Sequence, residues 1–105
     1  MIYLASPYSH PDSFVREHRY LHALQAVSVL LGDGRWVYSP IVHCHELAKV
    51  MGHDPDFSFW QPYDFHMISI CSEFMILRIE GWQESHGITA EKAEAERLGK
   101  MVIYL

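Results

Sequence analysis

The most unusual position in the sequence is a glutamate inside an apolar stripe. A helix is predicted over residues 88–99, and at about 100° per residue its apolar face holds Ile88, Ala95 and Leu98 with Glu91 between them. Burying an ionised carboxylate without partners costs several kcal/mol. We therefore expect Glu91 to be hydrogen-bonded, neutralised or functional; the alternative is a first-turn residue that complements the helix dipole and reaches solvent.

A second acid repeats this anomaly in the helix expected before the third strand. Asp64 shares a helix face with Ile68 and Cys71, so two carboxyl groups are expected to point toward one sheet. Asp64 also lies near the predicted start of its helix, where aspartate is favoured as a cap or first-turn residue. With Glu91, it makes a candidate catalytic pair.

A phenol, three hydroxyls and a glycine amide complete the candidate site. Tyr3 lies in the first predicted strand, where its phenol could reach a carboxylate, although strand aromatics commonly serve packing alone. Ser6 and Ser9 in the first loop, and Ser85 and Gly87 at the last helix start, offer the hydroxyls and amides that bind anions. Each serine also fits a cap or turn.

A histidine-rich stretch looks at first like a metal site. The sequence His43-Cys44-His45-Glu46 lacks the second histidine of a zincin motif, because Lys49 stands at that position. We interpret these histidines as a polar lining and predict no metal and no cofactor. A Gly-x-Ser-x-Gly elbow, a Gly-x-Gly-x-x-Gly loop and a Walker loop are all absent from the sequence.

Strands alternate with helices along the chain. Apolar runs predict strands at residues 2–5, 36–38, 74–77 and 101–104. Helical spacing and end signals predict helices at about residues 12–31, 46–51, 62–72 and 88–99. This order predicts an α/β fold: an open parallel sheet of about four strands, the third of them central, with helices on both faces. Ligands of such sheets bind beyond the carboxyl ends of the strands.

Composition limits the function classes. The 105 residues predict a single domain over 1–105, and the formal charge of −5 argues against a partner that is a nucleic-acid polymer. No run approaches the roughly 18 apolar residues of a membrane span, and the first residues lack a basic, apolar leader. We therefore expect a cytoplasmic protein with no membrane partner.

Three features in a fixed order match a known family. They are Ile2-Tyr3-Leu4-Ala5 with its serine-containing loop, then Asp64, then Ser85-x-Gly87-x-x-x-Glu91-x-x-x-Ala95-x-x-x-Gly99-Lys100. Over nearly its whole length the chain resembles the nucleoside 2-deoxyribosyltransferase-like superfamily, and within it a short bacterial and phage branch. It is also similar to the 2'-deoxynucleoside 5'-monophosphate N-glycosidases.

The resemblance implies a three-layer flavodoxin-like or Rossmann-like fold and a retaining cleavage of an N-glycosidic bond. Glu91 would attack the anomeric carbon, Tyr3 would hold Glu91 by a hydrogen bond, and Asp64 would deliver a proton to the leaving base. Because this helix-start position tends to lower the pKa of Asp64, burial or Glu91 would have to raise it for acid work. The resemblance implies a reaction without a cofactor.

One departure from the transferase pattern changes the expected substrate. Transferases usually carry Asp where this chain has Ser85, whereas the monophosphate N-glycosidases carry Ser there. The resemblance thus implies a (deoxy)nucleoside 5'-monophosphate, with Ser85, the Gly87 amide and Ser6 or Ser9 around the phosphate and water as the final acceptor. It also implies a homodimer or larger homo-oligomer.

Two other classes of function remain open at this stage. The chain could exchange bases between nucleosides as a transferase, or it could be a non-catalytic nucleotide-binding module. The second alternative is favoured by the end of the sequence at Leu105, since residues that family members supply beyond the last strand are expected to be absent. A structural domain with incidental acids would bind no small molecule.

Overall fold

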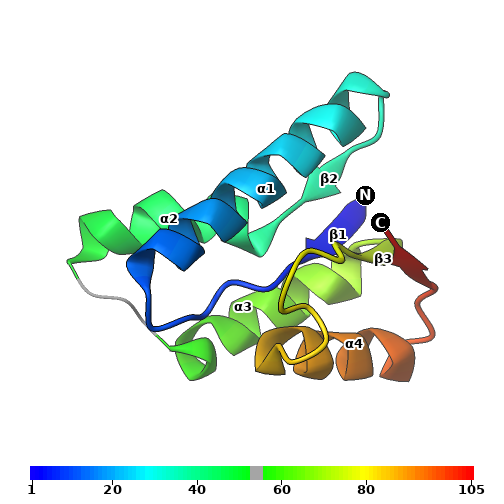
Figure 1. The fold of residues 1–105 in the computed structure, drawn as a ribbon. Coiled ribbons are helices and arrows are strands. Elements are labelled where there is room, and N and C mark those ends of the chain that lie inside the picture. The colour runs from blue at the N-terminus through cyan, green and yellow to red at the C-terminus, as the bar shows by residue number, and fades with distance from the viewer. Residues whose placement is uncertain (53–55) are drawn as a thin grey trace.

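The computed structural model describes residues 1–52 and 56–105, which form a Rossmann-like α/β fold with a four-stranded parallel sheet (Figure 1). The elements in chain order are β1 (Ile2–Ala5), α1 (Ser13–Gly32), β2 (Val37–Tyr38), α2 (Pro40–Met51), α3 (Phe57–Ile70), β3 (Glu73–Ile76), α4 (His86–Arg97) and β4 (Val102–Tyr104). The strand order is β2-β1-β3-β4, so β3 is central as predicted, beside β1. The order reverses between β1 and β3, and ligands of open α/β sheets bind at such a switch point.

Strand residues alternate between the two faces of the sheet. Ile2, Leu4 and Met75 pack with Leu30 of α1 on one face. The other face carries Tyr3, Ala5, Phe74 and Ile76, which pack with residues of α3 and α4: Ile68, Ile88 and Ala95. Figure 1 shows α1 above the sheet and α3 and α4 below it, so helices cover both faces as predicted.

Polar caps set the starts of the four helices in residues 1–52 and 56–105. Asp12, Ser39, Asp56 and Ser85 each accept a hydrogen bond from a backbone N–H in the first turn of α1, α2, α3 and α4 respectively. Gly52, with φ of 78°, ends α2 in the left-handed conformation that glycine adopts without strain.

Two predicted helix starts are wrong. Helix α2 begins at Pro40 rather than near Glu46, because Ser39 caps the helix and Pro40 occupies its first turn. Helix α3 begins at Phe57, so Pro62 lies inside the helix and not in its first turn. The loop predicted between α2 and α3 is therefore shorter than expected, and its residues 53–55 lie outside the described residues.

These corrections change the interpretation of both acids. Asp64 lies well inside α3, so a cap role and a pKa lowered by the helix start no longer apply to it. Helix α4 begins at His86, two residues before the predicted start, and Leu98 follows its end with 36% of its surface exposed. The buried stripe of α4 is Ile88, Glu91 and Ala95, without Leu98.

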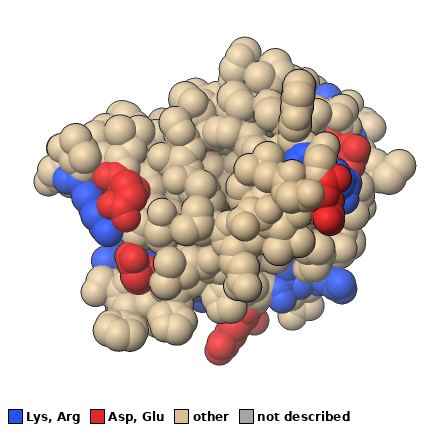
Figure 2. Space-filling view, turned by 90° about the horizontal axis from the view of Figure 1, so that it is seen from above, with Lys and Arg blue, Asp and Glu red and all other residues tan. Residues whose placement is uncertain are grey.

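Figure 2 looks onto the side of the molecule that carries α1. Its Lys, Arg, Asp and Glu side chains form small mixed groups, and broad uncharged areas separate them. Within the described part of the chain, no helix combines the length and the apolar character that crossing a membrane requires.

Candidate active site

A cavity of about 630 Å³ lies beside the carboxyl ends of the inner strands. Its walls come from the loop after β1, the first turns of α1, helices α2 and α3, the loop between β3 and α4, and the start of α4. The lining includes six of the seven residues predicted from sequence, namely Ser6, Ser9, Asp64, Ser85, Gly87 and Glu91. The seventh, Tyr3, lies behind Glu91.

Glu91 is held from behind by the first strand. The Tyr3 hydroxyl donates a hydrogen bond to Glu91 Oε2, and only 4% of the surface of Glu91 is exposed. The Tyr3 ring packs between Phe74 and Tyr38, with ring centroids 5.6 Å and 5.8 Å away. A strand in the middle of the sheet therefore fixes the phenol, and the phenol fixes one carboxylate oxygen of Glu91.

Asp64 reaches the same cavity from α3. It shares its helix face with buried Ile68, and 6% of its surface is exposed. Its Oδ1 atom is buried and has no hydrogen-bond partner among the described residues. A buried carboxyl oxygen without a partner is costly, so this atom is available to a proton or to a ligand group.

Burial raises the pKa values of both acids. Desolvation raises the pKa of Asp64 to about 7. Desolvation also raises the pKa of Glu91, to about 8; the Tyr3 hydrogen bond opposes this shift and the Asp64 charge adds to it. Burial therefore favours the protonated forms of both carboxyl groups up to about neutral pH.

Tyr3 remains a hydrogen-bond donor throughout this range. Burial, followed by the neighbouring charges of Glu91 and Asp64, raises its pKa well above the ordinary value. A neutral phenol beside a carboxyl group stabilises the ionised form of that carboxyl. Of the two acids, Glu91 is thus the one with a contact that favours its charged form.

Polar groups line the cavity near Glu91. Ser6 is buried, and its Oγ has no hydrogen-bond partner among the described residues. Ser85 caps α4 by accepting from the Ile88 N–H at 3.2 Å. A side chain at Gly87 would begin 3.8 Å from Ser85 Oγ and 4.0 Å from Glu91 Oε1, so the glycine leaves the space beside these two groups open.

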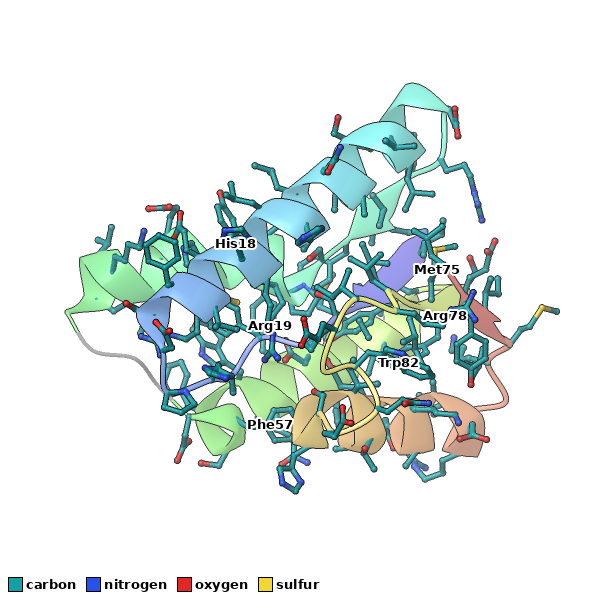
Figure 3. The ribbon with its side chains drawn as sticks, in the orientation of Figure 1. His18, Arg19, Phe57, Met75, Arg78 and Trp82 are labelled. Atoms are coloured by element: carbon teal, nitrogen blue, oxygen red, sulfur yellow. The ribbon has the colours of Figure 1, made fainter. Side chains whose placement is uncertain are left out.

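The cavity also contains two arginines that the sequence reasoning missed. Arg16 and Arg19, three residues apart in the first turns of α1, both line it. Arg16 donates to the His10 carbonyl, and Arg19 donates to the Ser9 carbonyl at 2.9 Å. Figure 3 shows Arg19 extending from α1 toward the loop after β3. The sequence does contain a signal for an anion site here, because two basic residues at helical spacing follow a serine-containing loop.

The Arg19 guanidinium lies against a glycine in the opposite loop. Gly81 has φ of 93°, and a side chain there would collide with the Arg19 guanidinium. The loop between β3 and α4 therefore makes room for this cation. Within the described residues, no group of three or more His, Cys, Asp or Glu is arranged to hold a metal ion.

Comparison with family models gives one match over the whole chain. Residues 1–105 match the family described as a domain of unknown function, DUF1937. The chain belongs to this family. No curated protein matches it. The DUF1937 fold, as this chain shows it, thus carries a cavity lined by two buried acids and two arginines, with the Tyr3 phenol bonded to one of the acids from behind.

The buried acids of this DUF1937 domain make its stability depend on pH. In the folded chain the pKa values of Asp64 and Glu91 are about 7 and about 8, whereas both are near 4 in the unfolded chain. The folded state therefore binds these protons more tightly. This contribution to the unfolding free energy is complete below pH 4 and is lost as pH rises to 8. Each group contributes a slope of up to about 1.4 kcal/mol per pH unit. In urea denaturation between pH 5 and 8, we expect Glu91→Gln to flatten the decline in unfolding free energy.

Glu96→Gln is the matched control, because Glu96 lies exposed on the same helix. It should retain the slope of the wild type. An unchanged slope in Glu91→Gln would contradict the assignment of a buried, protonated Glu91.

Proposed function

We propose that this chain cleaves the N-glycosidic bond of a (deoxy)nucleoside 5'-monophosphate through a glycosyl-enzyme on Glu91. The observation that carries the proposal is a buried carboxyl, held by the Tyr3 phenol, that shares one cavity with a second buried carboxyl, Asp64. Paired carboxyl groups are the usual machinery for glycosidic bond cleavage with retention. The resemblance of the sequence to N-glycosidases points in the same direction.

The two acids have complementary tasks in this reaction. The Glu91 carboxylate forms a bond to the anomeric carbon as the bond to the base breaks, and the base takes the proton of Asp64. Water then adds to the anomeric carbon, gives a proton back to Asp64, and releases Glu91 as a carboxylate. In the empty site Glu91 has the higher pKa, about 8 against about 7 for Asp64, so the first step needs the reverse of the resting distribution of protons. The Tyr3 hydrogen bond favours the ionised Glu91, and we propose that the bound substrate completes this shift.

The arginines favour a phosphorylated substrate over a nucleoside. Arg16 and Arg19 line the same cavity as Ser6, Ser9 and Ser85, and the α4 amino terminus opens into it. Cations, hydroxyls and helix-start amides together suit a phosphate. We therefore propose a 5'-monophosphate as the substrate class, and the cytoplasm as the compartment where the chain meets it.

The outer surfaces suit self-association. Helix α1 leaves Leu21, Val29 and Leu31 between 49% and 59% exposed, and broad uncharged areas occupy this side of the molecule (Figure 2). Large apolar side chains this exposed would lose contact with water in an assembly of copies of the chain. We propose a homodimer or larger homo-oligomer.

A product assay tests the proposed reaction. The protein is incubated with deoxynucleoside and nucleoside 5'-monophosphates and with the nucleosides, and free base is measured by chromatography. We expect Glu91→Gln to lower the rate at least about a thousandfold and Asp64→Asn about 100- to 10,000-fold. Glu96→Gln should leave the rate unchanged.

The alternatives give different results in the same assay. Binding without base release would identify a non-catalytic module. Base release that depends on an added free base would identify a transferase. Release that persists in Glu91→Gln would refute the proposed nucleophile.

The phosphate assignment makes a separate prediction. Arg19→Gln should lower kcat/KM for monophosphates about 10- to 100-fold, the usual effect of losing a charge-assisted hydrogen bond, and should spare the corresponding nucleosides. Arg35→Gln is the control, because Arg35 pairs with Glu73 at the surface and does not line the cavity. Equal losses for nucleotides and nucleosides would show that Arg19 only supports the loop.

A further inference from the structure

Tyr38 is a second phenol beside the catalytic pair. It ends β2 and is the direct partner of Tyr3 in the pairing of β1 with β2, and the two rings pack with centroids 5.8 Å apart. Tyr3 bonds Glu91, whereas the reaction proposed above gives Tyr38 no task. The Tyr38 hydroxyl oxygen is nevertheless buried, and it has no hydrogen-bond partner among the described residues. A buried hydroxyl without a partner is costly, so we expect it to find an acceptor in some state of the protein.

Asp64 lies at the centre of the buried titratable groups. Burial is the largest cause of the raised pKa of each of four neighbours, and the charge of Asp64 adds to it in Tyr3 on β1, Tyr38 on β2, Cys44 on α2 and Glu91 on α4. The pKa of Asp64 itself is raised by burial alone, and the α1 arginines line the same cavity without lowering it. In the resting protein, therefore, nothing among the described residues stabilises the charged form of Asp64.

The proposed reaction places a charge on Asp64 as soon as the base takes its proton. The Oδ1 atom of Asp64 is buried and has no hydrogen-bond partner among the described residues. Among its neighbours, Tyr3 is committed to Glu91, which has by then bonded to the sugar, and the Cys44 thiol is a weak donor. The Tyr38 hydroxyl is a full donor without a partner. It is thus the neighbour best suited to stabilise the new charge.

We propose that Tyr38 is a positioning residue whose hydroxyl donates a hydrogen bond to Asp64 when that carboxyl gives its proton to the leaving base. In this structure the two groups are not bonded to each other. An aspartate carboxyl turns over a broad range about its last side-chain bond, so this contact can form without movement of β2 or α3. Hydrogen bonds to a carboxylate are about twice as strong as those between neutral groups, so the contact favours the charged form. Tyr38 keeps its own hydrogen, because burial and its neighbours raise its pKa well above the ordinary value.

The inference rests on the proposed reaction for the step in which the charge appears, but the contact can be tested without substrate. The Asp64 carboxyl is titrated by carbon-13 NMR in full-length Glu91→Gln, where Asp64 is the one acid of the pair that still titrates. We expect the addition of Tyr38→Phe to raise the pKa of Asp64 by about one pH unit, the effect of losing one hydrogen bond to a charged group.

Tyr63→Phe is the matched control in the same background. The Tyr63 ring packs against that of Tyr38 with centroids 6.3 Å apart, and its hydroxyl lies 3.4 Å from His43 Nε2. Tyr63 adds to the raised pKa of Tyr38 but does not line the cavity that contains Asp64. Removal of its hydroxyl should therefore leave the titration of Asp64 unchanged.

Base release gives a second readout in the chain that retains Glu91. At pH 5, below the pKa values of both acids, Asp64 holds its proton at rest, so a bond to its charged form stabilises only the transition state. We expect Tyr38→Phe to lower kcat about three- to tenfold at pH 5 with little change in KM, because Tyr38 does not line the cavity. The loss should shrink toward pH 8, where the same bond also stabilises the resting protein. A merely structural role predicts a loss that does not depend on pH in this way.

Two results would overturn the inference. One is an unchanged titration of Asp64 in Tyr38→Phe. The other is an equal shift in Tyr63→Phe, which would assign the effect to the packing of the aromatic rings. The proposed reaction is judged separately by base release from the wild type. A shifted titration without base release refutes only the reaction, and base release without a shifted titration refutes only the role of Tyr38.

Discussion

The burial of the Glu91 carboxyl against the Tyr3 phenol is the contact on which the site depends. Tyr3 belongs to an inner strand and its ring packs against Phe74, so the position of Glu91 is tied to the core of the sheet. This burial raises the pKa of Glu91 to about 8, and the burial of Asp64 raises the pKa of that acid to about 7. Two buried acids with raised pKa values lower the stability of the fold at neutral pH. Acids with strongly raised pKa values in a cavity commonly mark functional sites.

The topology brings the other groups to these two acids. The strand order β2-β1-β3-β4 reverses between β1 and β3, and the loop after β1, the start of α1 and the start of α4 meet at that end of the sheet (Figure 1). Cations and hydroxyls therefore lie on the same cavity as the acids. Helix α2 adds His45 to the lining, with its Nδ1 atom 2.6 Å from the Tyr8 hydroxyl. One cavity thus brings charged and polar groups from four helices and two loops beside the two buried acids.

Local sequence patterns predicted the strands and the unusual place of Glu91, because both follow from the spacing of apolar residues along one element. Asp64 lies on the predicted face of its helix, but the helix begins earlier than predicted, because Asp56 is its cap and Pro62 lies inside it rather than in its first turn. Arg19 could not be placed from sequence. Its position depends on how two loops, distant along the chain, approach each other in three dimensions.

The stereochemistry of the reaction tests the central claim most directly. A nucleotide is cleaved in water containing methanol, and the anomer of the methyl glycoside is determined by proton NMR before it can equilibrate. A covalent intermediate on Glu91 requires two inversions, so the account requires the β-anomer, as in the substrate. Formation of the α-anomer, or an absence of cleavage, would contradict it.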